Sequence, residues 1–175
     1  GARDLAMAMQ ARGEGRVLDQ FANPDNPRAH LVGTGPEIWQ QTGGQISKLV
    51  ATLGTSGTLM GLSRRLKEYN PAIQIIGVEP YLGHKIQGLK NMKEAYRPEL
   101  FDKKRLDAKV KIDDEEAFEM TRRLAREEGL FVGYSAGAAM WAALQVASRP
   151  ENAGKTIVVI IPSFGERYLS TALFA

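Results

Sequence analysis

The stretch "KLVATLGTSGTLMGLSRRLKEYNPAIQIIGVEP", residues 48–80, contains the pattern that decides the fold. Its apolar run at 48–53 is typical of a buried strand, and the turn "GTSGT" follows. An amphipathic helix is predicted over 59–69 and a second apolar strand over 73–80. Two buried strands joined by a helix indicate parallel neighbours in a sheet that helices cover.

The rest of the chain continues this alternation. Downstream, the sequence predicts a strand over 108–112, a helix capped by Asp113 with Glu116 and ended by Gly129, a strand over 130–133, a helix from about 137 and a strand over 156–162. Upstream, it predicts a helix ended by Gly13, a strand over 16–21, a linker or crossing segment over 22–36 and a helix over 36–43. The predicted fold class is α/β, with three layers and a mostly parallel sheet carrying helices on both faces.

Composition narrows the class of protein. A chain of 175 residues holds one domain, or one domain and a piece of another. It has no cysteine, which excludes disulfides, thiolate metal sites and a cysteine nucleophile, and we expect no metal site. The net charge is +3, but the basic residues are scattered, so nucleic-acid binding is not expected. No apolar run approaches the roughly 20 residues of a membrane span, so we expect a cytoplasmic protein with no membrane contact.

The turn at 54–58 lies between the carboxyl end of a strand and the start of a helix, where open α/β sheets bind ligands. Free amides and the helix dipole favour an anion there, and glycines let the backbone approach it closely. The turn has no lysine and matches neither common nucleotide-binding pattern. It is therefore interpreted either as a cup for a monophosphate or as a tight turn without a ligand.

A second motif, "GYSAG" at 133–137, has the form G-x-S-x-G that marks serine nucleophiles in many hydrolases. A serine nucleophile needs a base, and in that fold the histidine follows the serine. Both histidines of this chain, His30 and His84, precede Ser135. Hydrolysis therefore remains a remote alternative, beside a plain strand-to-helix turn and a hydroxyl offered to a ligand.

Six stretches then point to a known family. They are "TGPEIWQQTGG" (34–44), "GTSGT" (54–58), "GVEP" (77–80), "GHKIQG" (83–88), "EEGLFVGYSAGAA" (127–139) and "PSFGERYLSTALF" (162–174). In this order they resemble the C-terminal part of the cysteine synthases, or O-acetylserine sulfhydrylases, which are pyridoxal-phosphate (PLP) enzymes of fold type II. The resemblance implies a tail of the small N-terminal domain at 1–22, a crossing linker at 23–35 and the large PLP-binding domain at 36–175.

The resemblance also implies roles for single residues. The PLP phosphate would be held by Gly54, Thr55, Ser56, Gly57 and Thr58, and the hydroxyl of Ser135 would face the pyridine nitrogen. The implied reaction makes L-cysteine from O-acetylserine and sulfide. Tyr81 stands where relatives that use O-phosphoserine carry an arginine, which favours O-acetylserine. Relatives are usually homodimers, and serine acetyltransferase is a possible partner. B-type and A-type features both occur, and the B-type is favoured.

One family element has no counterpart here. The family's Schiff-base lysine lies in an N-terminal segment of the type N-P-x-x-S-x-K, and neither Lys48 nor Lys85 matches it. We therefore expect these 175 residues to be a C-terminal fragment that is inactive by itself, with no catalytic residue of its own to name. The alternative is a truncated, non-catalytic homologue that acts as a binding or regulatory partner.

Overall fold

The computed structural model describes residues 1–94 and 96–174. Its centre is a four-stranded sheet in the order β3-β2-β1-β4, in which every pairing is parallel. The strands are β1 (Ile46–Thr52), β2 (Gln74–Pro80), β3 (Ala108–Ile112) and β4 (Thr156–Val159). The helices are α1 (Ala2–Ala11), α2 (Asp25–Ala29), α3 (Gly35–Gln41), α4 (Gly57–Tyr69), α5 (Asp114–Glu128) and α6 (Tyr134–Ala147). A π-helical turn (His30–Thr34) joins α2 to α3, and short 3₁₀ helices lie at Lys103–Arg105, Pro150–Asn152 and Gly165–Tyr168.

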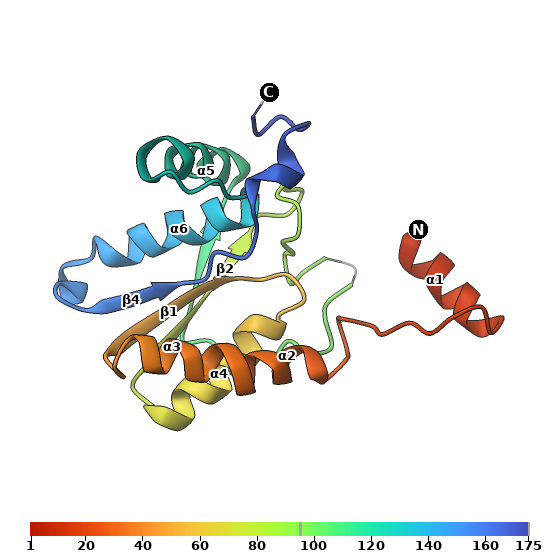
Figure 1. Cartoon of the computed structure of the whole chain (residues 1–175), viewed down its shortest axis with the longest axis horizontal. Coiled ribbons are helices and arrows are strands. Elements are labelled where there is room, and N and C mark those ends of the chain that lie inside the picture. Colours follow the sequence, from red (N-terminus) through yellow and green to blue (C-terminus); the bar gives the residue numbers. More distant parts are fainter. Residues whose placement is uncertain (95, 175) are drawn as a thin grey trace.

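Helices cover both faces of the sheet, as the continuous apolar strands predict. Figure 1 shows α5 and α6 on one side and α3 and α4 on the other. Because successive side chains of a strand point to opposite faces, β1 contributes to both cores. Val50 packs in the core beneath α5 and α6, whereas Leu49 and Ala51 pack in the core beneath α3 and α4. The predicted three-layer fold is therefore confirmed.

Most of the predicted elements are present, and the helix caps follow the sequence signals. In α5 the Asp113 side chain accepts from the amide of Glu116, whose carboxylate accepts in return from the amide of Asp113, each at 3.2 Å. Gly129 ends this helix in the left-handed conformation at φ 68°. Because the caps satisfy amides that the helix itself leaves free, they fix its first and last turns.

Two local predictions are wrong, and one further segment holds more regular structure than its sequence indicated. Residues 16–21 form no strand: Leu18 is 70% exposed, and no neighbouring strand pairs with this segment in the described part of the chain. The segment 22–36, predicted as a linker or crossing segment, contains α2 and the π-helical turn. Residues 130–133 do not join the sheet; only Val132 makes a bridge, antiparallel to Phe164. Consequently α6 begins at Tyr134, and Ser135 lies inside its first turn.

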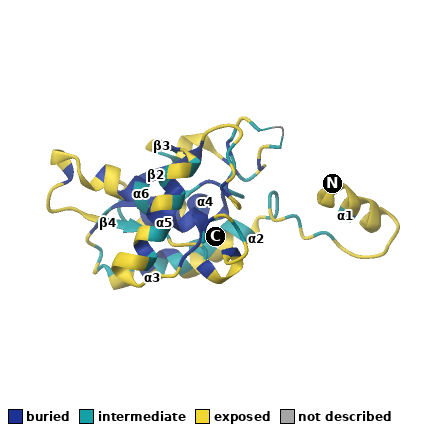
Figure 2. Ribbon diagram, turned by 90° about the horizontal axis from the view of Figure 1, so that it is seen from above, coloured by how far each residue is buried: buried dark blue, intermediate teal, exposed yellow. Residues whose placement is uncertain are grey.

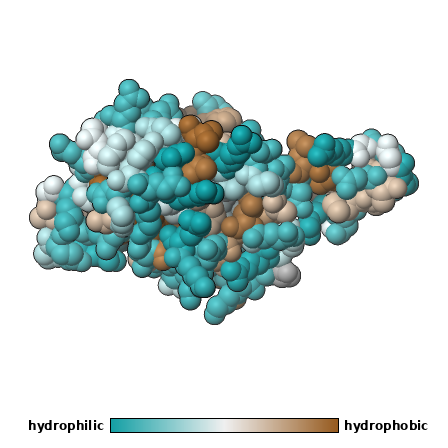
Figure 3. All heavy atoms as spheres, turned by 90° about the horizontal axis from the view of Figure 1, so that it is seen from below, coloured by the Kyte–Doolittle hydropathy of each residue, from teal (hydrophilic) through white to brown (hydrophobic). Residues whose placement is uncertain are grey.

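The first helix stands away from the sheet, and its Arg3 packs over the Tyr96 ring at 3.8 Å. No residue of α1 is buried, and Leu5 is 61% exposed. Figure 2 shows α1 as an exposed helix at the end of an extended segment, and Figure 3 shows hydrophobic atoms on this protrusion. Within the described residues, no helix combines the length and the apolar composition needed to cross a membrane.

Candidate active site

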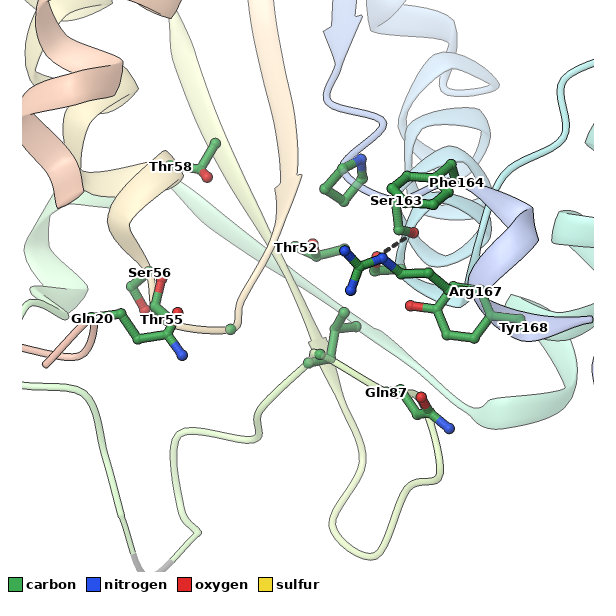
Figure 4. Close-up of a pocket in the computed structure, with 15 residues that line it drawn as sticks. Gln20, Thr52, Thr55, Ser56, Thr58, Gln87, Ser163, Phe164, Arg167 and Tyr168 are labelled. Carbon is green, nitrogen blue, oxygen red and sulfur yellow. Dashed lines mark hydrogen bonds between the residues drawn. The ribbon is translucent and has the colours of Figure 1, made fainter. Parts of the chain in front are cut away.

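A cavity of about 500 Å³ lies at the carboxyl-terminal edge of the sheet. Five parts of the chain line it: the segment before α2 with Gln20, the turn after β1, the loop after β2, the start of α6 and the segment after β4. Of the predicted residues, Gly54, Thr55, Ser56, Thr58 and Ser135 line it, whereas Gly57 does not. Figure 4 shows the turn with Thr55, Ser56 and Thr58 on one side and Ser163 with Arg167 on the other.

The turn at 54–58 leaves hydrogen-bond donors without partners. Ser56 caps α4 in the left-handed conformation, at φ 72°, which is uncommon for a serine and occurs most often at functional sites. Its side chain is 3% exposed, yet its Oγ has no hydrogen-bond partner among the described residues. The first amide that donates along α4 is that of Met60, to Ser56 O at 2.9 Å. The amides of Thr58 and Leu59 precede it and have no acceptor within the helix, so donors gather here.

Neither glycine of the turn can carry a side chain, because other parts of the chain lie too close to it. A Cβ on Gly54 would lie 2.5 Å from the carbonyl oxygen of Gly88 in the loop after β2. A Cβ on Gly57 would lie 1.8 Å from Oδ1 of Asn26 in α2. Asn26 in turn donates to Thr55 Oγ1 at 3.1 Å and to the carbonyl of Gln20 at 2.6 Å. Gly57 therefore serves the site indirectly, by leaving room for the side chain that holds Thr55.

A histidine lies behind the turn. Nε2 of His30 is 3.2 Å from Thr58 Oγ1, and its Nδ1 is 3.0 Å from Thr34 Oγ1. Burial lowers the pKa of His30, so a neutral imidazole is favoured. The π-helical turn places His30 and Thr34 on the same side, four residues apart, and so connects α2 to Thr58.

Ser135 lies opposite the turn, near the start of α6. Its hydroxyl is 2.8 Å from the hydroxyl of Ser163, and this bond is drawn at Ser163 in Figure 4. Among the described residues, neither imidazole hydrogen-bonds Ser135: His30 contacts Thr58, and His84 contacts Glu94 at 3.2 Å. The geometry therefore offers Ser135 a hydroxyl partner and no histidine base.

The loop after β2 is held in place by a buried carboxylate. Glu79, 2% exposed, accepts from Lys109 at 2.8 Å, from Lys111 at 3.0 Å and from the amide of Met92 at 2.9 Å. Burial by itself raises the pKa of Glu79, but these bonds outweigh it, and the pKa is lowered. Lys90 N also donates to the carbonyl of Leu53 at 2.8 Å. These contacts hold the loop, including Gln87 and Gly88, against the cavity.

Sequence reasoning missed part of the lining. Six further polar side chains line the cavity: Gln20, Thr52, Gln87, Ser163, Arg167 and Tyr168. Arg167 packs over the Phe164 ring, with 5.0 Å from its guanidinium carbon to the ring centroid. Their place in the sequence could have indicated two of them, because Gln87 and Ser163 both follow the carboxyl ends of predicted strands, where ligands bind in open α/β sheets. In the described residues, no group of three or more His, Asp or Glu side chains gathers where a metal ion could be held.

The fold and this site belong to a recognisable class. The sequence model of the pyridoxal-phosphate dependent enzymes matches residues 1–163, and the chain therefore belongs to that family. Family members depend on pyridoxal phosphate. The resemblance to cysteine synthases inferred from the six motifs is confirmed.

Three relatives show how close the likeness is. Cysteine synthase B of Pseudomonas aeruginosa is 51% identical over 174 residues, which are 99% of this chain and 58% of that protein. Cysteine synthase A of Escherichia coli K12 is 42% identical over 177 aligned residues, covering 91% of this chain and 54% of that protein. The crystal structure of a cysteine synthase from Entamoeba histolytica superposes with a TM-score of 0.91 at 38% identity, covering 99% of this chain and 53% of that one. The chain thus spans somewhat more than half the length of the relatives it matches.

Proposed function

We propose that this chain supplies the PLP-binding site of a cysteine synthase, and that the turn at 54–58 holds the phosphate. The observation that carries the proposal is the buried, unpartnered hydroxyl of Ser56 at the first turn of α4. A phosphate would accept from this hydroxyl, from Thr55 and Thr58, and from the free amides, while the helix dipole favours its charge. The residues present therefore fit the phosphate group of PLP.

The remainder of the cavity suits the ring. Its volume of about 500 Å³ is that of an ordinary cofactor site. Ser135 faces the turn across this space, and Ser163 already engages its hydroxyl at 2.8 Å. We propose that the Ser135 hydroxyl forms a hydrogen bond with the pyridine nitrogen, and that Ser163 orients this hydroxyl. The cofactor, when bound, supplies the electron sink for cleavage at the β-carbon.

The proposed reaction replaces the acetate of O-acetylserine by sulfide and yields L-cysteine. The identity to a B-type enzyme, 51%, against 42% for an A-type enzyme favours the B-type. Gln20 and Gln87 present amide groups to the cavity from two different loops, and we assign them to the amino-acid substrate. A homodimer, a cytoplasmic location and serine acetyltransferase as a partner stay predictions, as do the division at 1–22, 23–35 and 36–175 and the inactivity of the 175 residues alone.

The test of the phosphate assignment compares Thr58→Ala with Thr58→Ser in a PLP titration followed by absorbance. Loss of one hydrogen bond to a charged group costs about 1.5–3 kcal/mol, so Thr58→Ala should weaken binding by about 10- to 150-fold. Thr58→Ser keeps the hydroxyl and should bind close to the parent value. Ser56→Gly, which suits the left-handed backbone, removes the second hydroxyl. Unchanged affinity in both Thr58→Ala and Ser56→Gly would contradict the assignment.

A further inference from the structure

A second cavity, of about 270 Å³, lies at the amino-terminal edge of the sheet. It is lined by Lys48 near the start of β1, by Gln74 at the start of β2 and by Lys155 directly before β4. Strands β1 and β4, which bring Lys48 and Lys155 together, run side by side in Figure 1. Lys48 lines this cavity and Thr52, four residues further along β1, lines the PLP site. Because a strand rises about 3.3 Å per residue, these nearest lining positions of β1 are roughly 13 Å apart. It is therefore a separate site.

Lys48 is the unusual residue of this cavity. Its side chain is only 7% exposed, and its ammonium donates to Oε1 of Gln74, a neutral amide that cannot balance the charge. None of the described lining residues is acidic. Nearby Asp107 is already engaged by Lys67 at 2.9 Å and by the amide of Ile75 at 2.7 Å. The ammonium group of Lys48 is partly buried, and without a counter-ion such a group favours a negative ligand in the cavity.

The charged residues around Lys48 also favour a negative ligand in this cavity. Burial lowers the pKa of Lys48, and the charge of Lys155, which lines the same cavity, lowers it further. The charge of Arg149 also lowers the pKa of Lys48. Glu151 and Asp107 raise it, but burial and Lys155 together outweigh them, and the pKa is lowered. Positive potential therefore prevails around Lys48.

Apart from the Ser47 hydroxyl, which can donate or accept, the remaining polar side chains of the lining present donors. The Oδ1 of Asn70 is occupied by the amide of Ala72 at 3.0 Å, which leaves the Asn70 NH₂ group available. The Oε1 of Gln74 is occupied by Lys48, which leaves the Gln74 NH₂ group available. Two ammonium groups and two amide NH₂ groups thus line one small space.

We propose that this cavity is an anion site for a small dianionic oxyanion of the sulfate or phosphate type, held between Lys48 and Lys155. Two positive charges match a dianion better than a monoanion, and NH₂ groups satisfy the further oxygens. The bound ion would join the starts of β1, β2 and β4 and raise the thermal stability of the sheet edge, because it binds only the folded state.

The probe is inorganic sulfate, added at constant ionic strength with chloride as the balancing salt, because general screening must not vary. Backbone amide shifts of Ser47, Asn70 and Lys155 are followed by ¹H–¹⁵N NMR, which reports this cavity separately from Thr55 and Thr58 in the PLP site. Saturable shifts are expected at Ser47, Asn70 and Lys155. Acetate, a monoanion, should bind more weakly; equal or tighter binding of acetate overturns the dianion assignment.

Lys48→Met and Lys155→Met should each weaken sulfate binding at these amides by about tenfold or more, since each removes a charge-assisted bond. The shifts at Thr55 and Thr58 should be unaffected, so failure of this site is distinguishable from failure of the PLP site. Lys103→Met, in a 3₁₀ helix that does not line the cavity, is the matched control and should bind sulfate as the parent does. Lys155 is exposed, so its variant decides the matter if Lys48→Met does not fold. Absence of saturable shifts, or unchanged affinity in Lys155→Met or a folded Lys48→Met, overturns the proposal.

Discussion

Gly57→Ala is expected to damage the phosphate site without touching the cavity. The new methyl group would lie 1.8 Å from Oδ1 and 2.3 Å from Cγ of Asn26, far inside contact distance. Gly57 has no positive φ, so backbone strain contributes little and the effect comes from crowding. Asn26 must move, and its bonds to Thr55 Oγ1 (3.1 Å) and to the carbonyl of Gln20 (2.6 Å) would be lost.

The magnitude follows from these contacts. Overpacking of this kind costs about 1–3 kcal/mol. The two lost hydrogen bonds add about 0.5–1.5 kcal/mol each, part of which water recovers at this half-buried position. A decrease of about 2–4 kcal/mol in the free energy of unfolding is therefore expected, together with weaker binding of PLP through the displaced Thr55. Urea denaturation measures the first quantity, and an absorbance titration measures the second.

A double-mutant cycle tests the cause. In the Asn26→Ala background the added methyl group meets no amide, so Gly57→Ala should cost much less there than in the parent. Gly33→Ala is the control, because a Cβ at Gly33 meets nothing within 4 Å. An equal cost of Gly57→Ala in both backgrounds would refute the reasoning, since crowding against Asn26 could not then be the source.

The remaining predictions concern three other sites. Ser135→Ala should leave the fold intact and lower the rate of β-elimination modestly in the whole enzyme; complete loss together with covalent labelling of Ser135 by a fluorophosphonate would favour the hydrolase alternative. The pKa of Glu79 is lower in the folded state than in the unfolded state, where it is about 4.3. The ionised carboxylate therefore stabilises the fold at pH values above the unfolded-state pKa, and this stabilisation is lost as the pH falls through the folded-state pKa. Urea denaturation from pH 6 downward should therefore show a shallower decline in Glu79→Gln than in the parent, whereas the exposed Glu68→Gln should match the parent; equal slopes for all three would count against this role. No described residue that lines the PLP cavity is a lysine. Treatment of the 175-residue chain with PLP and borohydride should therefore leave no stoichiometric pyridoxyl adduct on one specific lysine. A single adduct accompanied by sulfhydrylase activity would show the prediction of inactivity to be wrong.

The sheet and its helices could be predicted from short sequence patterns, because these elements carry their signals within their own residues. The strands β1, β2 and β4 are continuous apolar runs, and α5 carries both its capping box and its terminal glycine in sequence. The same reasoning failed at 16–21 because a short apolar segment forms a strand only when a neighbour offers hydrogen bonds, and pairing is decided by the rest of the chain. Residues 130–133 fail for the same reason: Val132 finds only a single partner in Phe164.

The candidate site was predicted only where its residues lie in recognisable sequence motifs. The turn at 54–58 and Ser135 were recognised from motifs, and the structure brings them to opposite sides of one cavity. Asn26 and His30 were missed because they lie in a segment rich in Pro, Asn and Gly, about 30 residues from their partners, and no pattern connects them to Thr55 and Thr58. The π-helical turn that aligns His30 with Thr34 has no sequence signature of its own.

These two missed residues explain how an unfavourable turn is maintained. A left-handed serine with an unpartnered hydroxyl is a strained arrangement that persists only when the surroundings determine it. Asn26 fills the space beside Gly57 and fixes Thr55, and His30 fixes Thr58, although neither side chain lines the cavity. The donors are thus ordered before any anion arrives, and binding need not order them. In the proposed phosphate site, residues that never touch the phosphate should consequently influence its affinity, acting from α2 and the π-helical turn that precede the sheet in the chain.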